Sequence, residues 1–345
     1  EQCIIASLMA DPIHILSVTR KPSSASYQQR VENWIAPLAE QEIHVTPRTW
    51  PRPGPERHAL LDEMRRVDAV WWHRNILPTR DAKAVRAAAK RWVIDFDDPL
   101  SYSSTNGGQP SWVRRRRFKA TVGRTDASLV GSRFLAELSE PFGHRVEIMP
   151  MAVDLPEAVP SRETHKSDAV TMLWLGSGST QEYLRDIAAV FSELDTDVPI
   201  TFRLVGGEAL TFPGSKVKID HRPWSPEEQD RALREADLGL CPMPDTLWTR
   251  GKCPYKILQY MAWGLPWVGS AVGENLVAAG ANEAQRGLTV STTAQWAQAI
   301  QSLAEDRALR LEVGQRGRAY VERVHDRVAL ARQLGAFWRS LVSSP

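Results

Sequence analysis

The sequence predicts an α/β protein made of two doubly wound parallel-sheet domains in tandem. Short β-branched runs alternate with helical patterns along the first half, and the same alternation returns along the second half. Strand–helix alternation is typical of a parallel sheet with helices on both faces. Residues 150–167 lack periodicity and contain Pro156, Pro160 and several charges, which is typical of a linker. At 345 residues, the chain is long enough for each domain to have its own core.

The first half is expected to hold six strands with helices between most of them. The strands are predicted at Ile13–Val18, Ile43–Thr46, Ala69–His73, Trp92–Phe96, Ala127–Gly131 and Arg145–Met149. Helical patterns cover Tyr27–Leu38, Arg80–Lys90 and Arg114–Val122.

The second half begins with a nearly all-apolar run, Val170–Leu175, as expected for a strand buried on both faces. A helix is predicted over Gln181–Leu194. Further strands are predicted at Ile200–Val205, Val217–Asp220, Leu238–Cys241, Trp267–Gly269 and Leu288–Val290. The segment from Thr293 to about Ser340 shows three consecutive helical patterns.

Composition narrows the class of protein. Hydrophobic residues make up 43% and charged residues 24%, which indicates a globular chain. The net charge of +2 does not favour a nucleic-acid partner. Three cysteines (Cys3, Cys241 and Cys253) are too few and scattered for a disulfide framework or a zinc site, so we expect a cytoplasmic protein. The apolar start lacks a basic leader, so we expect no signal peptide, and no apolar run reaches the roughly 18 residues of a membrane-spanning helix.

Residues 250–266 are the most informative stretch of the chain. Lys252 and Lys256 flank a proline turn, an amphipathic helix follows and ends at Gly264, and Pro266 then precedes a β run. Such a corner combines fixed cations with free backbone N–H groups at the start of a helix. It is therefore predicted to bind an anion, most often phosphate. The alternative is a pair of exposed lysines on a helix face.

A glycine- and serine-rich loop lies directly between the strand Val170–Leu175 and the next helix. Gly176 lets the backbone approach an anion, and Ser177, Ser179 and Thr180 offer hydroxyl groups for capping the helix or binding phosphate. A tight turn with a helix cap is the alternative reading. The dinucleotide fingerprint would require a third glycine where Gln181 stands, so NAD binding is poorly supported.

Three acidic residues cluster at the end of the strand Trp92–Phe96. Alternation along a strand would send Asp95 and Asp97 to one side and Asp98 to the other. A carboxylate here can orient or deprotonate a hydroxyl group of a ligand, or stabilise positive charge that develops beside it. The alternatives are a divalent metal site and helix-capping aspartates.

Two other loops are candidates for ligand contacts. The loop Thr19–Tyr27 carries small residues, including Ser24 and Ser26, that allow close approach of a ligand. His73 ends the third strand, where it is either an acceptor contact or a satisfied structural histidine.

In the second half, Arg222 and Trp224 follow a strand, and Trp224 is a candidate for stacking on a base or for ordinary packing.

Four consecutive arginines, Arg114–Arg117, stand between aromatic residues. This pattern suits an anionic membrane surface or a phosphate-bearing acceptor. A solvated helix start is the alternative.

The order Lys-x-x-Gln-Tyr-Met-Ala-x-Gly-x-Pro, from Lys256 to Pro266, resembles the donor-site segment of GT-B glycosyltransferases. The resemblance is to the retaining nucleotide-sugar enzymes of family 4 in particular (glycosyl transferases group 1). It covers roughly residues 13–338, and it is strong in the second half. In the first half it is diffuse and rests on Ile94–Asp98, Asp126–Ser132 and Pro150–Asp154.

The chain departs from the family pattern in places. Most members carry two glutamates with seven residues between them, and these positions are Gly251 and Gln259 here. Gln259 can still bind ribose hydroxyls, whereas Gly251 has no side chain to bind a sugar. The match is closer to a branch with Gly-Lys-Cys-Pro-x-Lys, in which Tyr255 is the variable residue. The glycine loop lacks the family's usual cation, so the resemblance assigns the phosphate charge to Lys252 and Lys256.

The resemblance implies a catalytic group made of Asp97, which aligns with a family histidine, and the two lysines. It implies donor contacts from Gly176, Ser177, Ser179, Thr180, Arg222, Trp224, Gly251, Tyr255 and Gln259. Acceptor-side contacts are expected from Ser24, Ser26, His73, Asp95 and Asp98.

The implied architecture is GT-B, with two Rossmann-like domains facing a cleft. An acceptor-side domain is expected over residues 10–152, a linker over 153–167 and a donor domain over 168–325. A last helix over 326–345 is expected to pack back toward the first domain.

The implied activity is transfer of a hexosyl or related sugar from a UDP- or GDP-linked donor to a hydroxyl, with retention of configuration and without metal or cofactor. The acceptor would be a glycan or a lipid-linked saccharide, as in polysaccharide biosynthesis at the inner face of a membrane. The alternatives are a non-catalytic nucleotide-sugar or glycan-binding protein and a GT-B epimerase or phosphorylase.

Overall fold

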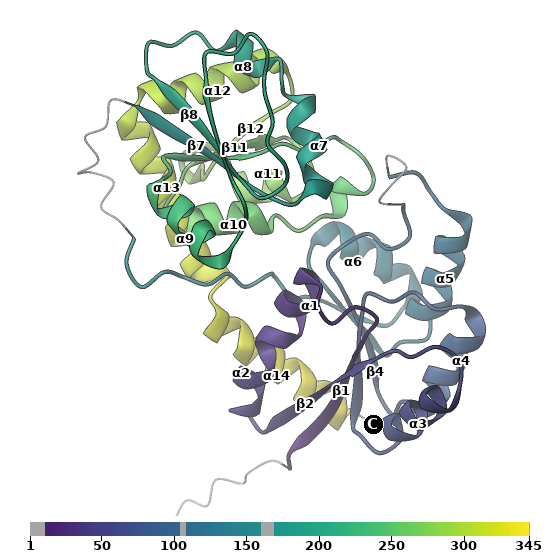
Figure 1. Ribbon diagram of the computed structural model, residues 1–345. Coiled ribbons are helices and arrows are strands. Elements are labelled where there is room, and N and C mark those ends of the chain that lie inside the picture. Colours follow the sequence, from purple (N-terminus) through teal and green to yellow (C-terminus); the bar gives the residue numbers. More distant parts are fainter. Residues whose placement is uncertain (1–10, 104–107, 160–168, 345) are drawn as a thin grey trace, which may run out of the picture. The chain divides into compact units, whose positions relative to one another are not determined.

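The computed structural model describes residues 11–103, 108–159 and 169–344, apart from the side chain of Glu283. The apolar start and most of the predicted linker, residues 160–167, lie outside this described part. The chain divides into two compact units. One comprises the described residues up to Met151 together with those from Val328 onward, and the other runs from Ala152 to Arg327. Within the described residues, each unit is built on one six-stranded sheet (Figure 1).

The sheet of the first unit has the strand order β2-β1-β3-β4-β5-β6, and all its strands are parallel. The chain leaves β1 toward β2 on one side and continues toward β3 on the other, so the order reverses between β1 and β3. The strands are β1 (Ile13–Thr19), β2 (Ile43–Thr49), β3 (Ala69–His73), β4 (Trp92–Phe96), β5 (Ala127–Val130) and β6 (Arg145–Ile148). The helices are α1 (Ala25–Arg30), α2 (Ile35–Ala39), α3 (Pro55–Met64), α4 (Thr79–Ala88), α5 (Trp112–Val122), α6 (Arg133–Ser139) and α14 (Arg327–Ser343).

The sheet of the second unit has the order β12-β11-β10-β7-β8-β9 and is also parallel. Its order reverses between β7 and β10. The strands are β7 (Val170–Leu175), β8 (Ile200–Val205), β9 (Lys218–Arg222), β10 (Leu238–Cys241), β11 (Trp267–Ser270) and β12 (Leu288–Val290). The helices are α7 (Gly178–Asp186), α8 (Val190–Glu193), α9 (Pro226–Glu235), α10 (Tyr255–Ala262), α11 (Glu274–Ala279), α12 (Thr293–Glu305) and α13 (Arg307–Val324).

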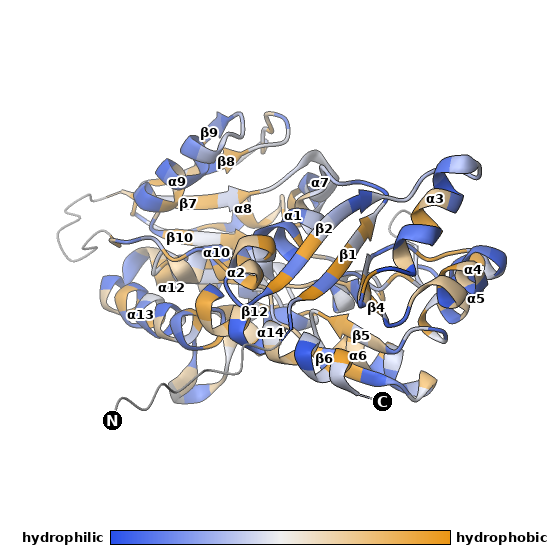
Figure 2. Cartoon of the chain, turned by 90° about the horizontal axis from the view of Figure 1, so that it is seen from below, coloured by the Kyte–Doolittle hydropathy of each residue, from blue (hydrophilic) through white to orange (hydrophobic). Residues whose placement is uncertain are grey.

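Both cores are rich in tryptophan. Trp71, Trp72 and Trp92 are fully buried in the first unit, and Trp174 and Trp267 in the second. Burying one such side chain removes about 200 Å² from water, worth about 5 kcal/mol before conformational entropy is counted. Figure 2 shows orange, hydrophobic stretches on strands β1 and β7 and blue, hydrophilic stretches on the outer helices α4, α5 and α13.

Two predicted helices are each broken in the structure. The helix expected over Tyr27–Leu38 stops at Val31, whose φ is −132°, and resumes as a 3-10 turn (Glu32–Trp34) and α2. Pro37 explains the break, because proline in the interior of a continuous helix removes a hydrogen bond and clashes with the preceding turn. The helix expected over Gln181–Leu194 becomes α7 and α8.

Between α7 and α8 the backbone bonds span three residues, as from the Val190 N–H to the Ile187 carbonyl. This tighter winding is typical of 3-10 turns. It buries Leu184, Ile187 and Val190 in the same core.

Helix α14 follows the second unit in the sequence but belongs to the first unit from Val328 onward. The Gln41 side chain donates to the Ala331 carbonyl over 3.0 Å, and the ring centroids of Trp71 and Trp338 lie 5.4 Å apart. Among the described residues, no helix has the length and apolar character needed to cross a bilayer.

Candidate functional site

The order of the second sheet reverses between β7 and β10, and at this point the two strands separate. Their ladder pairs Leu238 with Met172 and Gly239 with Leu173. Beyond it, the Tyr260 hydroxyl of α10 accepts from the Leu175 N–H over 3.2 Å and lies 3.1 Å from the Leu240 carbonyl oxygen. In open α/β sheets, ligands bind outside the carboxyl ends of the strands at such a reversal. Tyr260 therefore fixes α10 at the place where a ligand is expected.

Gly239 makes this placement of α10 possible. A Cβ atom at this position would lie 2.3 Å from the Tyr260 ring. Any side chain on Gly239 would therefore push the ring, and α10 with it, away from the sheet. Sequence reasoning did not identify Gly239 or Tyr260. Their contact joins β10 to the later helix α10, and a contact between two separate elements cannot be read from the local sequence pattern.

Trp174 connects α10 to the glycine loop. Its ring passes under Gly176, where a Cβ atom would lie 2.3 Å from it. The Lys256 ammonium lies 4.6 Å from the centroid of the same ring. The structure thus brings Lys256 and the loop that starts at Gly176 together against one indole, although they are far apart in the sequence.

The two lysines have no carboxylate partner among the described residues. Both ammonium groups instead lie near indole rings, Lys252 at 5.9 Å from the Trp248 centroid and Lys256 over Trp174. Burial lowers the pKa of Lys256 to about 8, and the nearby charge of Lys252 acts in the same direction. An uncompensated, partly desolvated pair of cations is a strong anion site, because desolvation increases its electrostatic attraction.

The loop between β7 and α7 presents its hydroxyl groups to solvent. Ser177 is the N-cap residue of α7, but its side chain makes no capping bond. Its hydroxyl lies 2.9 Å from that of Ser179, while the Thr180 hydroxyl donates to the Ser177 carbonyl. Ser177 and Ser179 are exposed. The start of this nine-residue helix therefore lies open beside Trp174 and Lys256.

Other predicted donor residues lie on or near the same edge. Gly251 is buried, and Tyr255 and Gln259 are partly exposed on α10. Burial raises the pKa of Tyr255 to about 12, so its hydroxyl stays protonated. Arg222 is held by ion pairs with Asp220 and Glu228.

Trp224 is 55% exposed and lies next to Gly206, which itself touches the Gly176 carbonyl. The indole N–H of Trp224 donates to Gln229 over 3.2 Å. The exposed ring is therefore presented at the same strand ends as the glycine loop.

Gln181 has a structural function. Its side-chain oxygen accepts from the Glu208 N–H over 2.9 Å, and its amide nitrogen donates to the Glu208 carbonyl. This pair of bonds holds the loop after β8, where Gly206 and Gly207 adopt positive φ. The third glycine of a dinucleotide fingerprint is thus replaced by a side chain that is fully engaged.

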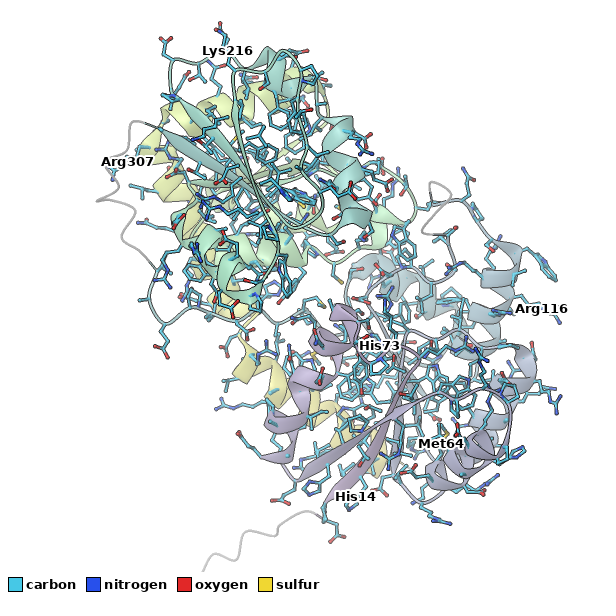
Figure 3. All side chains as sticks on the ribbon, in the orientation of Figure 1. His14, Met64, His73, Arg116, Lys216 and Arg307 are labelled. Carbon is cyan, nitrogen blue, oxygen red and sulfur yellow. The ribbon has the colours of Figure 1, made fainter. Side chains whose placement is uncertain are left out.

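In the first unit, the strand order reverses between β1 and β3, and most of the predicted acceptor-side residues lie there. Thr19 ends β1, His73 ends β3, and Ser26 lies on α1. The Ser26 hydroxyl donates to Asp97 Oδ1 over 2.7 Å and lies 3.0 Å from His73 Nε2. Ser24 caps α1 by accepting from the Tyr27 N–H. Figure 3 shows His73 within this unit.

Asp95 corrects one prediction. Its side chain is buried, and the Arg30 guanidinium binds both its oxygens over 2.8 and 3.1 Å. It cannot touch an acceptor directly. Through Arg30, it fixes α1 to the end of β4. Arg30 also donates to the Met149 carbonyl, which links α1 to the segment after β6.

Asp97 and Asp98 correct another prediction. Strand alternation placed them on opposite sides, but β4 ends at Phe96 and both carboxylates turn to one guanidinium, that of Arg74. Arg74 has a φ of +56°, an uncommon backbone state for a residue other than glycine. Burial by itself would raise the pKa of Asp97, but Arg74 and the Ser26 hydroxyl outweigh it and hold the pKa below its ordinary value. Residues in an uncommon backbone state, such as Arg74, cluster at functional sites.

The described residues contain no cluster of three or more His, Cys, Asp or Glu side chains arranged to hold a metal ion. Of the three carboxylates that the sequence offered for this role, Asp97 and Asp98 are engaged by Arg74 and Asp95 by Arg30. Sequence reasoning missed the contribution of Arg30 and underrated Arg74, because each pairs with acids more than twenty residues away.

Nearly the whole chain resembles the folds of several solved structures. Sucrose-phosphate synthase from Thermosynechococcus elongatus matches with a TM-score of 0.75 and 16% identity, over 97% of this chain and 100% of that chain. The HepE protein of Anabaena in complex with UDP matches with a TM-score of 0.69 and 14% identity, over 95% and 100%. A glycosyltransferase from Rickettsia africae matches with a TM-score of 0.70 and 12% identity, over 97% and 100%. The chain has the GT-B fold.

This GT-B fold confirms the prediction of two Rossmann-like doubly wound domains followed by helices at the C-terminal end. Residues 155–306, which include the glycine loop and both lysines, match the family model described as Glycosyl transferases group 1. None of the curated protein sequences compared with the chain matches it.

Proposed function

We propose that the protein is a glycosyltransferase that uses a nucleoside-diphosphate sugar as donor. One observation carries the proposal: the Lys256 ammonium lies on the same indole as the open glycine loop, at the strand reversal of the second unit. The charge of Lys252 acts on Lys256, and neither ammonium has a carboxylate partner among the described residues. The family match over residues 155–306 supports the same reading. HepE of Anabaena, which shares the fold, has been solved with UDP and with UDP-glucose, which favours UDP over GDP as the nucleotide here.

In this proposal, the donor diphosphate lies between the start of α7 and the two lysines. Lys252, Lys256 and the first N–H groups of α7 bind its oxygens and stabilise the charge that develops as it departs. The exposed ring of Trp224 stacks on the base, and Gln259 binds ribose hydroxyls. Sugar specificity then depends on groups near Gly251, which itself offers only backbone.

The acceptor hydroxyl is activated from the first unit. Asp97 is ionised and accepts a hydrogen bond from that hydroxyl. The acceptor oxygen then bonds to the anomeric carbon while the bond from that carbon to the phosphate oxygen breaks. As this bond forms, the acceptor proton moves from its hydrogen bond with Asp97 to the departing phosphate oxygen. Because the acceptor enters on the face that the phosphate leaves, the configuration is retained without a protein nucleophile and without a metal. Residues 10–152 form the acceptor domain in this reading, and residues 168–325 form the donor domain.

A panel of donors tests the proposal. The full chain is incubated with UDP-, GDP- and ADP-linked hexoses and with a mixed set of saccharide acceptors, and release of the nucleoside diphosphate is measured. Acceptor-dependent release from at least one donor is expected. Binding without any release would favour a non-catalytic nucleotide-sugar protein, and conversion of the donor without acceptor would favour an epimerase.

We also propose that α5 attaches the protein to an anionic membrane surface, where a lipid-linked acceptor in polysaccharide biosynthesis would lie. Trp112 and Val113 are 72% and 51% exposed, and Arg115–Arg117 are exposed as well. None of the four arginines has a carboxylate partner among the described residues. Arg116 points away from the unit (Figure 3), with its guanidinium 5.5 Å from the Trp112 centroid.

Cations in the first turn of α5 oppose the helix dipole, so they weaken the helix that carries them. A loss of helix stability of this kind is expected where the residues bind a partner. Exposed aromatic and basic side chains together suit a bilayer interface, and each cation near such a surface contributes about 1 kcal/mol.

A further inference from the structure

The contacts of Ser26 determine where its single hydroxyl hydrogen lies. Its oxygen is 2.7 Å from Asp97 Oδ1 and 3.0 Å from His73 Nε2. Arg74 holds the pKa of Asp97 below its ordinary value, so this carboxylate is ionised and can only accept. Ser26 therefore donates to Asp97. Because no second hydrogen is available on Ser26, His73 must be the donor in its contact with Ser26.

The direction of that contact determines the state of the imidazole. His73 is buried, and burial lowers its pKa to about 3, so the ring is neutral and carries one N–H. With the hydrogen on Nε2, the other nitrogen is an acceptor. Thr19 Oγ1 lies 3.3 Å from Nδ1 and donates to it, while Thr19 itself accepts from the Lys21 N–H over 3.3 Å. The donors thus run in one direction, from Lys21 through Thr19, His73 and Ser26 to Asp97.

This direction excludes a serine nucleophile. A Ser–His pair at 3.0 Å has the spacing of an activated hydroxyl. Activation requires an unprotonated imidazole nitrogen facing the serine, and here that nitrogen bears the hydrogen. The chain of hydrogen bonds serves the carboxylate at its end.

We propose that Ser26, His73 and Thr19 are positioning residues that aim Asp97 at the acceptor hydroxyl, an inference that rests on the proposed function. The hydrogen bond from Ser26 and the ion pair with Arg74 both end on Oδ1 of Asp97. In this proposal, Oδ2 faces the acceptor. The charged groups around the ring are consistent with a neutral imidazole. Arg74 and Arg30 lower the pKa of His73, and only Asp97 raises it. Tyr27 packs edge-on against the ring at 5.4 Å.

The tautomer of His73 is the direct test, and it needs no substrate. The full chain is labelled with ¹⁵N-histidine, and the His73 signals are identified by their loss in His73→Gln. We expect the neutral Nε2–H form, unchanged between pH 5 and 8. An Nδ1–H form, or protonation of the ring within this range, would overturn the proposed direction of the chain.

Kinetics provide the second test. Ser26→Ala should lower kcat about tenfold or more, the effect expected from losing a hydrogen bond to a charged group. It should also shift the acidic limb of the pH profile upward, because Asp97 loses a group that lowers its pKa. Ser26→Thr keeps the hydroxyl and should restore both, and Ser23→Ala, in the exposed loop before α1, is the matched control. Unchanged kcat and pH profile in Ser26→Ala would refute the positioning role.

The two proposals fail separately. If wild-type protein releases no nucleotide from any donor, the proposed function fails while the tautomer can still be measured. If transfer occurs but the tautomer is reversed, only the positioning chain is wrong.

Discussion

Replacing Lys256 by methionine should make the protein more stable and nearly inactive. Methionine keeps an unbranched apolar side chain on the Trp174 ring but removes the ammonium, which has no carboxylate partner among the described residues. The two effects have opposite signs because the same buried charge opposes folding and assists the reaction. A site that trades stability for function is expected to behave in this way.

The stability effect follows from the pKa of Lys256, which burial lowers from 10.5 to about 8. Below pH 8 the lysine is charged in both the folded and the unfolded chain, so the full penalty of burying the charge is present. Between pH 8 and 10.5 the unfolded chain binds more protons, and stability rises with pH. A shift of this size corresponds to roughly 3 kcal/mol. Loss of the cation–π contact offsets about 1 kcal/mol of this, so Lys256→Met should raise the free energy of unfolding at pH 7 by about 2 kcal/mol.

The effect on the reaction follows from the charge on the departing diphosphate. Removing one preorganised group that stabilises such charge typically costs about 3–4 kcal/mol in the transition state, a fall of about 10²–10³ in kcat. The diphosphate also provides the missing counter-charge in the complex, so it should raise the pKa of Lys256 again on binding.

The assays are urea unfolding at pH 7 and at pH 10.5, and the rate of nucleotide release with the best donor. The stability gain of Lys256→Met should be much smaller at pH 10.5, where the folded lysine is neutral and the unfolded lysine has lost about half of its charge, so that most of the penalty is gone. Lys216→Met is the matched control, because Lys216 is exposed in the same unit (Figure 3) and should change neither quantity. A less stable Lys256→Met at pH 7 would refute the desolvation reasoning, and near-normal turnover would refute the donor site.

Three further predictions concern the same surfaces. The KM for the donor should rise as pH increases from 7 to 9, because free Lys256 loses its charge near pH 8; a KM that stays flat over this range would contradict the assignment. Gly176→Ala should weaken donor binding and lower the free energy of unfolding by about 1–3 kcal/mol, because its Cβ would meet the Trp174 ring at 2.3 Å. Calorimetry measures the binding and thermal unfolding the stability. Wild-type values in both would show that the loop tolerates the methyl group. Changing Arg114–Arg117 to glutamine should release the protein from anionic vesicles at low salt, while turnover on a soluble acceptor is kept. The proposed attachment of α5 to a membrane would be wrong if the wild-type protein sediments equally with neutral and anionic vesicles, or if the variant sediments like the wild type.

Local pattern was enough for most of the secondary structure. Ala69–His73, Trp92–Phe96 and Val170–Leu175 were predicted with the bounds that the structure has, because apolar β-rich runs between loops depend on neighbours in the sequence. The same reasoning failed inside two helices. There, Pro37 and a tight turn before Val190 broke a pattern that periodicity alone read as continuous.

The sequence by itself determined the fold class. It also singled out the Lys252–Lys256 corner as a candidate anion site and the acidic cluster after β4 as a candidate site, because each depends on residue types at close spacing. The tertiary structure alone decided which of these groups are free to act. It buried Asp95 on Arg30, turned Asp97 and Asp98 to Arg74, and placed Lys256 and Gly176 against the same indole. The physical reason is that charge pairing, burial and the direction of a hydrogen bond are set by partners distant in the sequence, which only folding brings into contact.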